Sequence, residues 1–339
     1  MSAGAATRVL VTGGAGFIGM HVALRLARDG ADVGAIDNFD PYYDVALKEA
    51  RVRELARERR VAFRRHELCD ADATAALFRD GGFSHVVHLA AQPGVRYSLV
   101  NPGAYLANNV DAFGHVLEGC RHARIAHLLY ASSSSVYGAN HTLPFSEDQR
   151  TDTPVSLYAA TKKADEMMAY SYAHLYALPA TGLRFSTVYG PWGRPDMATM
   201  IFTRAILEGT PIEVFNHGDM RRDFTYVDDI VEGVVRVLAK PPAPDTATGA
   251  PHAIYNIGNN RSVPLGEFID TLERLLGRRA TRVDKPMQPG DVKDTYASID
   301  RIAARTGFAP KTALGDGLAA FVAWYRGYYG AAPAAGARS

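Results

Sequence analysis

The chain has 339 residues, of which 47% are hydrophobic and 22% charged, and its formal net charge is +1. These values are typical of a globular protein long enough for two lobes or one large α/β domain. A near-neutral charge without long Lys/Arg runs argues against a nucleic-acid partner, and no apolar run reaches the roughly 18 residues of a membrane span.

Short β-branched runs alternate with helical patterns through the first half of the chain. The expected strands span 8–12, 32–36, 61–65, 85–90, 127–131 and 180–185. The expected helices span 17–28, 45–60, 74–79, 102–122 and 156–176. Strand–helix units of this length predict an α/β fold with a Rossmann-type, doubly wound parallel sheet.

The regular alternation ends at about Gly190, after which prolines become frequent. We therefore expect an NAD-binding Rossmann domain over 1–190, a smaller α/β substrate lobe over 191–330 and a frayed tail over 331–339. Segment 223–256 is expected to return to the first domain, which makes the second lobe discontinuous.

The cysteines and histidines carry no metal or disulfide pattern. Cys69 and Cys120 form no CxxC motif, so we expect free thiols in a reducing cytoplasm. His85 and His88 would point to opposite faces of their strand, which argues against a shared metal. The first residues lack the apolar stretch of a secretory signal.

A glycine-rich turn, Gly13-x-x-Gly16-x-x-Gly19, joins the first expected strand to the first expected helix. Glycine suits a tight turn whose backbone approaches a pyrophosphate, and the helix start then offers free N–H groups. A plain strand–helix loop is the alternative. Asp37, at the end of the second strand, favours NAD over NADP because its carboxylate would accept from ribose hydroxyls and repel a 2′-phosphate. Asp70, after the third strand, is a candidate adenine contact or a helix N-cap.

Tyr158 and Lys162 are four residues apart and would share one face of a helix. The lysine charge would favour the phenolate and hold the nicotinamide ribose, so that the phenolate accepts a proton from a hydroxyl. Ser133 lies in a four-serine run at the carboxyl edge of the sheet, where ligands bind, and could donate to the same hydroxyl. Either motif alone could be a solvated helix face or a polar turn, but together they favour a redox site.

The glycine motif, Leu89-Ala90-Ala91, Ser133 and Tyr158-x-x-x-Lys162 together resemble the extended short-chain dehydrogenase/reductase family of nucleotide-sugar enzymes, over about 7–329. The resemblance implies a tightly bound NAD that is regenerated each turnover, a UDP-sugar substrate, and a homodimer through the helices near 102–122 and 156–176. It implies cofactor contacts from Gly13, Gly16, Phe17, Ile18, Gly19, Asp37, Asn38, Asp70, Leu89, Ala90, Ala91, Gln92, Asn109, Tyr158, Lys162 and Phe185.

The two positions after Ser133 bear on the reaction. Sugar 4,6-dehydratases resemble Thr-Asp-Glu at this point and UDP-glucuronate decarboxylases resemble Thr-Ser-Glu, whereas Ser134 and Ser135 carry no carboxylate. The resemblance therefore implies an epimerase, an isomerase that oxidises sugar C4 to a ketone with transient NADH. The keto-sugar then turns and is reduced from its opposite face.

Segments 190–197, 215–226 and 288–292 resemble those of UDP-glucuronate 4-epimerases, which interconvert UDP-glucuronate and UDP-galacturonate. This resemblance implies that Phe215 stacks on uracil, Arg222 faces the diphosphate and Asp291 accepts from the uridine ribose. A sugar carboxylate needs charge-assisted and hydroxyl donors. The candidates around the sugar are Arg96, Ser133, Ser134, Ser135, Tyr158, Thr187 and Arg194, with a loop salt bridge as the alternative for the last.

Two other kinds of function stay open. One is a UDP-glucuronate decarboxylase or a UDP-hexose 4-epimerase on the same fold. The other is a non-catalytic, NAD-binding regulatory protein, which would have no need for Ser133, Tyr158 and Lys162 together.

Overall fold

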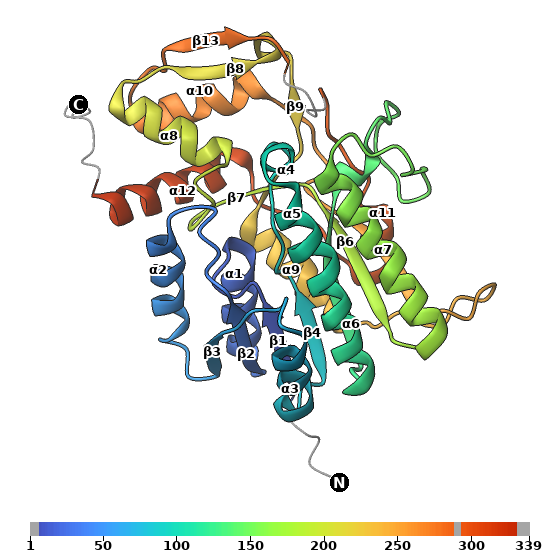
Figure 1. The fold of residues 1–339 in the computed structure, drawn as a ribbon. Helices are drawn as coiled ribbons and strands as arrows, with labels where there is room; N and C mark the ends of the chain where they lie inside the picture. Colours follow the sequence, from blue (N-terminus) through green and yellow to red (C-terminus); the bar gives the residue numbers. More distant parts are fainter. Residues whose placement is uncertain (1–6, 288–292, 331–339) are drawn as a thin grey trace.

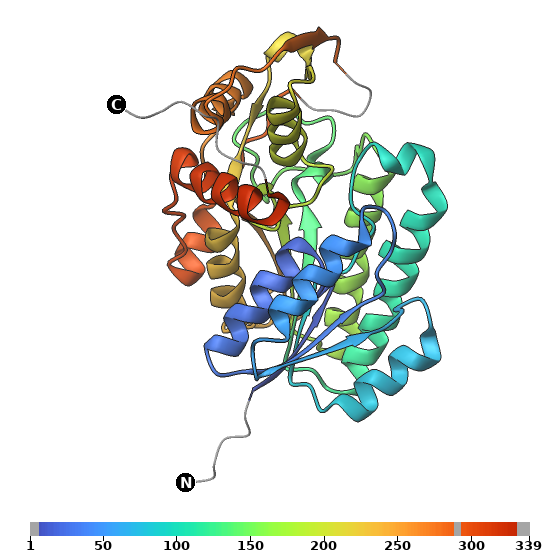
Figure 2. The same cartoon turned by 90° about the vertical axis from the view of Figure 1, so that its left-hand side faces the viewer.

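The structure is a computed structural model that describes residues 7–287 and 293–330. Figure 1 shows a larger lobe, built on a twisted sheet, and a smaller lobe that lies above it. Figure 2, turned by 90°, shows that the smaller lobe covers one end of the strands. None of the helices in the described ranges is long and apolar enough to cross a membrane.

A seven-stranded sheet forms the centre of the larger lobe, and all its neighbouring strands are parallel. Its order is β11 (His252–Ile257), β6 (Ala180–Phe185), β5 (His127–Ser133), β4 (His85–His88), β1 (Arg8–Thr12), β2 (Asp32–Asp37) and β3 (Val61–Arg65). The chain runs outwards in both directions from β1 and β4. A doubly wound sheet of this kind binds ligands at the carboxyl ends of its strands, where the order reverses. The predicted Rossmann-type fold is confirmed.

Helices cover both faces of the sheet, and each face has its own hydrophobic core. One face carries α1 (Phe17–Arg28), α2 (Val45–Leu55) and α9 (Val227–Leu238). The other face carries α3 (Ala71–Gly81), α6 (Ala112–His122) and α7 (Leu157–Tyr176). The hydrophobic stripes of these helices meet the buried β-branched residues of the strands, which removes both from water.

Capping residues explain where several helices begin. The Asp70 carboxylate accepts from Ala73 N at 2.9 Å, so α3 begins three residues earlier than expected. The helix expected over 102–122 consists of α5 (Pro102–Tyr105), a π-helix, η1 (Leu106–Asp111), and α6. The π-helix adds a wide turn beside the pocket described below.

The smaller lobe encloses a third core. It contains α8 (Ala198–Glu208), β8 (Ile212–Phe215), α10 (Leu265–Leu276), β13 (Arg282–Lys285) and α12 (Leu314–Tyr329). The rings of Phe224 and Phe268 stack at 4.4 Å between centroids in this core. Two parallel strands, β7 (Thr187–Tyr189) and β10 (Phe224–Tyr226), lie between the lobes. Segment 223–256 begins with β10, supplies α9 to the larger lobe and ends within β11 of the central sheet.

Candidate active site

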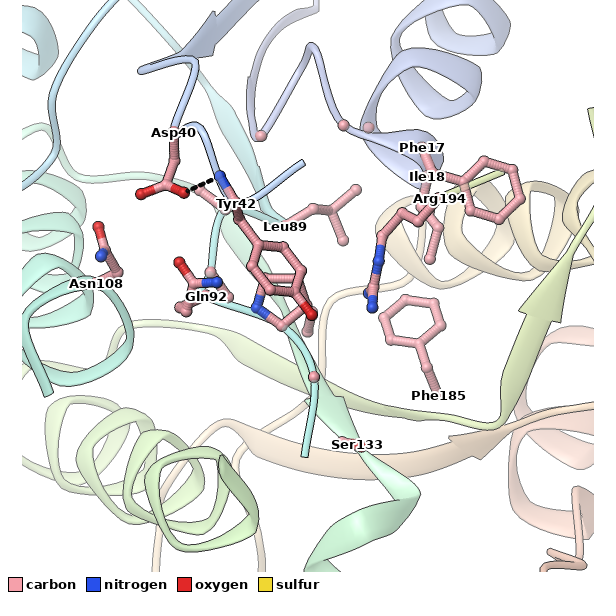
Figure 3. A pocket seen from close by; sticks show the side chains of 18 of the residues that line it. Phe17, Ile18, Asp40, Tyr42, Leu89, Gln92, Asn108, Ser133, Phe185 and Arg194 are labelled. Atoms are coloured by element: carbon pink, nitrogen blue, oxygen red, sulfur yellow. Dashed lines mark hydrogen bonds between the residues drawn. The ribbon is translucent and has the colours of Figure 1, made fainter. Parts of the chain in front are cut away.

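A large pocket extends along the carboxyl ends of the strands, below the smaller lobe. Its lining includes the glycine turn, the end of β2, the serine run, α7 and the loop that follows β7. In Figure 3, Asp40, Gln92 and Asn108 lie to the left, Arg194 lies to the right above Phe185, and Ser133 lies at the bottom. Distant segments therefore meet at the edge of the sheet where a ligand is expected.

The glycine turn leaves no room for side chains. Gly13 has φ +70°, and a Cβ there would lie 2.9 Å from Ala90 N. A Cβ at Gly19 would lie 2.0 Å from Gly13 O. Helix α1 begins after Gly16 without a side-chain cap, so the N–H groups of its first turn face the pocket unsatisfied by a cap. A diphosphate suits such a cradle, because it brings negative charge to the helix start.

The loop after β4 forms the neighbouring wall of the pocket. The buried hydroxyl of Thr12 accepts from Leu89 N and Ala90 N, each at 3.1 Å. This holds the loop against the glycine turn. The predicted cofactor contacts on these two segments and β6 all line the pocket, namely Phe17, Ile18, Leu89, Ala90, Ala91, Gln92 and Phe185.

Asp37 ends β2 and is almost completely buried, with 8% of its surface exposed. Its Oδ1 accepts from Phe39 N at 2.8 Å and lies 3.5 Å from the Nζ atom of Lys48. Asn38, also in the lining, donates to Glu67 Oε2 at 2.9 Å. A carboxylate in this place suits the adenosine ribose of NAD. The residues that line the pocket therefore fit a dinucleotide from its diphosphate to its adenosine end.

Two predicted cofactor contacts, Asp70 and Asn109, have other tasks and do not line the pocket. Asp70 is exposed and caps α3. Asn109 is buried, accepts from Gln92 N at 2.7 Å and donates to Thr161 Oγ1 at 3.0 Å, which ties the loop after β4 to α7. For Asp70 the alternative of a helix N-cap is seen, and contact of either residue with the cofactor stays a prediction. His66, Glu67, Leu68 and Asn108, which lie close to them in the chain, line the pocket.

Ser133, Tyr158 and Lys162 all line the pocket, from two different elements. Ser133 ends β5, where its hydroxyl accepts from Ser135 N at 3.2 Å. Tyr158 and Lys162 lie one turn apart on α7, which Ser156 caps by accepting from Ala159 N at 3.1 Å. The lysine is buried, and its Nζ donates to Asp165 Oδ2 at 3.0 Å.

Arg194 enters the pocket from the loop after β7 and forms a two-pronged ion pair. Its Nε and Nη2 donate to the carboxylate oxygens of Asp196 at 3.0 and 2.6 Å. The hydroxyl of Tyr42, from the β2–α2 loop, donates to Asp196 Oδ2 at 3.0 Å. Burial opposes ionisation of Asp196, but the nearby guanidinium holds the pKa of this carboxyl below its usual range. The alternative of a loop salt bridge is thus realised, although Arg194 still lines the pocket.

The remaining predicted substrate residues divide into two groups. Ser134, Ser135 and Thr187 line the pocket, as do Ser133 and Arg194. Arg96, Phe215 and Arg222 are not in this lining, and Asp291 lies outside the described residues. The Arg96 guanidinium lies over the Phe215 ring at 4.8 Å, Arg222 Nη1 donates to Lys293 O at 2.7 Å, and Asp291 falls in the undescribed segment 288–292.

The sequence analysis missed the contribution of the β2–α2 loop and of α2. Asp40, Tyr42, Tyr43 and Lys48 all line the pocket. Arg51, on the next turn of α2 after Lys48, is fully buried and donates to backbone carbonyls of the glycine turn and of the Arg194 loop. The adjacent tyrosines Tyr42 and Tyr43, directly after the end of the second strand, were the available signal for this wall.

A dinucleotide cradle beside a serine, a tyrosine and a lysine defines the site of an NAD-dependent enzyme that oxidises a hydroxyl group. Residues 9–258 match the model of the NAD dependent epimerase/dehydratase family. The chain belongs to this family.

Similar proteins cover almost the whole chain. Protein CapI of Staphylococcus aureus is 48% identical over 332 residues, which are 95% of this chain and 99% of that protein. UDP-glucuronate 4-epimerase 2 of Arabidopsis thaliana is 47% identical over 331 residues, 95% of this chain and 76% of its own. The crystal structure of UDP-glucuronic acid 4-epimerase from Bacillus cereus, in complex with UDP-glucuronic acid and NAD, matches with a TM-score of 0.87. It is 33% identical and covers 95% of this chain and 100% of that one.

Proposed function

We propose that the protein is a UDP-glucuronate 4-epimerase, an isomerase that interconverts UDP-glucuronate and UDP-galacturonate. One observation carries the proposal. The pocket joins a Ser133, Tyr158 and Lys162 set to a dinucleotide cradle, yet the positions after Ser133 hold hydroxyls and no carboxylate. The named activities of the Arabidopsis and Bacillus relatives support the same substrate.

The residues that would hold NAD follow the length of the pocket. The glycine turn and the start of α1 bind the diphosphate, Asp37 accepts from the adenosine ribose, and Lys162 holds the nicotinamide ribose. When bound, NAD would supply the acceptor for the hydride of sugar C4 and the donor for its return, so the cofactor would be regenerated in each turnover and would act as a prosthetic group.

Proton transfer is the task of the chain's own side chains. Tyr158, as phenolate beside the charged Lys162, accepts the proton of the C4 hydroxyl during oxidation. After the keto-sugar has turned, the phenol gives the proton back to the same C4 oxygen as a hydride returns to the opposite face of C4. Ser133 donates a hydrogen bond to that oxygen in both half-reactions. The charges and protons therefore balance over a cycle with no external reductant.

The substrate contacts proposed around the sugar explain how the intermediate can turn. Hydroxyls of Ser134, Ser135 and Thr187 bind a carboxylate through single hydrogen bonds, which break more easily than a bidentate guanidinium pair. Arg194 lies at the edge of the same pocket with its charge already paired by Asp196. We place the uracil and diphosphate against Phe215 and Arg222, the uridine ribose at Asp291, and Arg96 near the phosphates or the carboxylate.

The test is to incubate the purified protein with UDP-glucuronate and to follow the anomeric NMR signals, without and with added NAD. Formation of UDP-galacturonate supports the proposal, and Tyr158→Phe should abolish it while leaving NAD binding in place. A UDP-pentose as the main product would identify a decarboxylase. Interconversion of UDP-glucose and UDP-galactose alone would identify a UDP-hexose epimerase. No turnover with NAD supplied would refute an enzymatic role on these sugars.

We also propose that the protein is a homodimer. Apolar side chains are exposed on adjacent helices near 97–111 and on α7, including Leu99 at 63%, Val100 at 77% and Met167 at 53%. A second copy that covers these faces would remove them from water. Light scattering of the purified protein should give twice the mass of one chain. A monomer at micromolar concentration would contradict this.

We propose a cytoplasmic location, which the state of the two cysteines supports. Cys69 is exposed, Cys120 is buried, and both are free thiols. An exposed free thiol suits a reducing environment.

A further inference from the structure

The catalytic lysine has a carboxylate partner that the proposed reaction does not explain. Lys162 Nζ donates to Asp165 Oδ2 at 3.0 Å, three residues further along α7. Only 3% and 2% of the two side chains are exposed. A buried ion pair is expensive to desolvate, and it is weak grounds for assuming a gain in stability alone. We therefore look for a role of this ion pair in the active site, whose lining includes Lys162.

The Asp165 carboxylate interacts with the lysine through one of its two oxygens, Oδ2. Its second oxygen, Oδ1, is buried and has no hydrogen-bond partner within the described residues. Its neighbour Glu166 is differently engaged, because it pairs with Arg184 at 2.8 Å and accepts from Ser132 at 2.7 Å. Burial raises the pKa of the Asp165 carboxyl to about 6, and the adjacent Lys162 ammonium opposes this rise.

Few other charges act on the lysine in this part of the chain. His88, on β4, lies near enough to feel its charge, but burial lowers the pKa of this imidazole to about 3 and keeps it neutral. Tyr130, on β5, is fully buried, and the carboxylates of Asp165 and Glu166 add to the effect of burial in raising the pKa of its hydroxyl. Tyr158 shares the helix face with Lys162. Asp165 is therefore the anion that compensates the ammonium.

We propose that Asp165 is a positioning residue for the epimerase reaction, which keeps Lys162 in its charged form and points its ammonium along α7, where both side chains are almost completely buried. This inference rests on the proposed function, because it assigns the charged lysine the tasks of binding the nicotinamide ribose and favouring the Tyr158 phenolate. A lysine buried without an anion gives up its proton several pH units earlier than a solvated one. Without Asp165, both tasks should fail as the pH rises.

The experiment compares Asp165→Asn with wild type in NAD binding to cofactor-free protein, measured by calorimetry from pH 7 to 9.5. For Asp165→Asn we expect NAD affinity to fall about tenfold more than for wild type across this range, because a neutral amine loses its charge-assisted hydrogen bonds. The kcat for UDP-glucuronate should show a matching alkaline decline that wild type lacks, with KM for the sugar little changed. Asp165→Glu, which restores the charge, should recover most of the wild-type pH dependence.

Lys163→Gln is the matched control. Lys163 makes the same three-residue pairing with Glu166, at 3.3 Å, but it is partly exposed and does not line the pocket. Its replacement should leave the pH dependence of NAD binding unchanged. Asp165→Ala must behave as Asp165→Asn does, so the test stands if either variant folds.

The outcomes separate the two proposals. Equal pH dependence of NAD binding in wild type, Asp165→Asn and Asp165→Ala would overturn the role of Asp165. An alkaline loss of NAD affinity in the variants supports that role even if wild type fails to convert UDP-glucuronate, in which case only the proposed function is refuted.

Discussion

Arg51 joins three segments around the pocket, and its replacement is the most informative perturbation of the fold near the site. From α2 it donates to Ala15 O at 3.0 Å in the glycine turn and to the Tyr43 hydroxyl at 2.7 Å. It also donates to Trp192 O at 2.7 Å, two residues before Arg194. The side chain is fully buried and has no carboxylate partner in the described part of the chain. Its charge is stabilised by backbone oxygens instead.

The expected magnitude follows from the acceptors that Arg51→Met would leave behind. Methionine keeps much of the aliphatic volume but removes every donor. A buried acceptor without a donor costs about 1–3 kcal/mol, and the carbonyls of Ala15 and Gly193, which both accept from Arg51, would be in this state. Removing the guanidinium recovers part of its own desolvation cost. We therefore expect the free energy of unfolding to fall by about 3 kcal/mol, and NAD and the UDP-sugar to bind more weakly.

Urea unfolding followed by tryptophan fluorescence measures this change, since Trp192 lies in the affected loop. Arg53→Met on the same helix is the control, because Arg53 is exposed and its loss should change the free energy of unfolding by less than about 0.5 kcal/mol. Equal urea midpoints for the two variants would refute the reasoning. A loss of stability with unchanged affinity for both ligands would show that Arg51 supports the fold without placing the two loops.

Three further predictions concern the cofactor, the product and pH. Asp37→Asn should reduce the preference for NAD over NADP about tenfold, because the repulsion of a 2′-phosphate is lost; an unchanged affinity ratio in titrations of cofactor-free protein would remove Asp37 from the adenosine ribose. Ser134→Ala or Thr187→Ala should increase a UDP-pentose by-product, since the 4-keto intermediate is a β-keto acid that loses CO2 when its C5–carboxylate bond is free to align with the π-system of the ketone. The same product ratio as wild type by NMR would contradict this. Asp223 is fully buried, and burial raises its pKa from 3.8 to about 6. The folded state therefore holds a proton that the unfolded state releases between these values, so ionisation destabilises wild type as pH rises, by at most about 3 kcal/mol. In urea unfolding, the free energy of unfolding of Asp223→Asn minus that of wild type should rise from pH 4 to 6 and then level off. If this difference is the same at every pH, ionisation of a buried Asp223 is not the cause.

The elements of the larger lobe were predictable because their signals are local. The expected helix over 17–28 and the strands over 8–12, 61–65 and 180–185 have the bounds seen in the structure. Alternation of apolar residues, glycine at a tight turn and helix spacing all act within a few residues. The helix end expected at 60 was wrong, since α2 ends at Leu55. Nothing in the local pattern marked that end.

The partners of the site residues could not be predicted in the same way. The contact of Tyr42 with Asp196 spans 154 positions, and the hydrogen bonds of Arg51 reach both lobes. Which side chain of α2 faces the pocket depends on how that helix rests on the sheet. Asp70 and Asn109 illustrate the converse, because each has a residue type suited to the cofactor but a backbone position that turns it to capping or to bracing a loop.

The amino-acid sequence by itself determined the sheet, the glycine turn and the shared helix face of Tyr158 and Lys162, because each depends on spacing along a few turns of chain. Only the tertiary structure decided what surrounds them. The partners Asp165 and Asp196 are near neighbours of Lys162 and Arg194 in the chain, but the fold buries the first pair and places Arg194 in the wall of the pocket. The physical reason is that burial and charge compensation belong to the packed assembly, where segments far apart in the chain exclude solvent together.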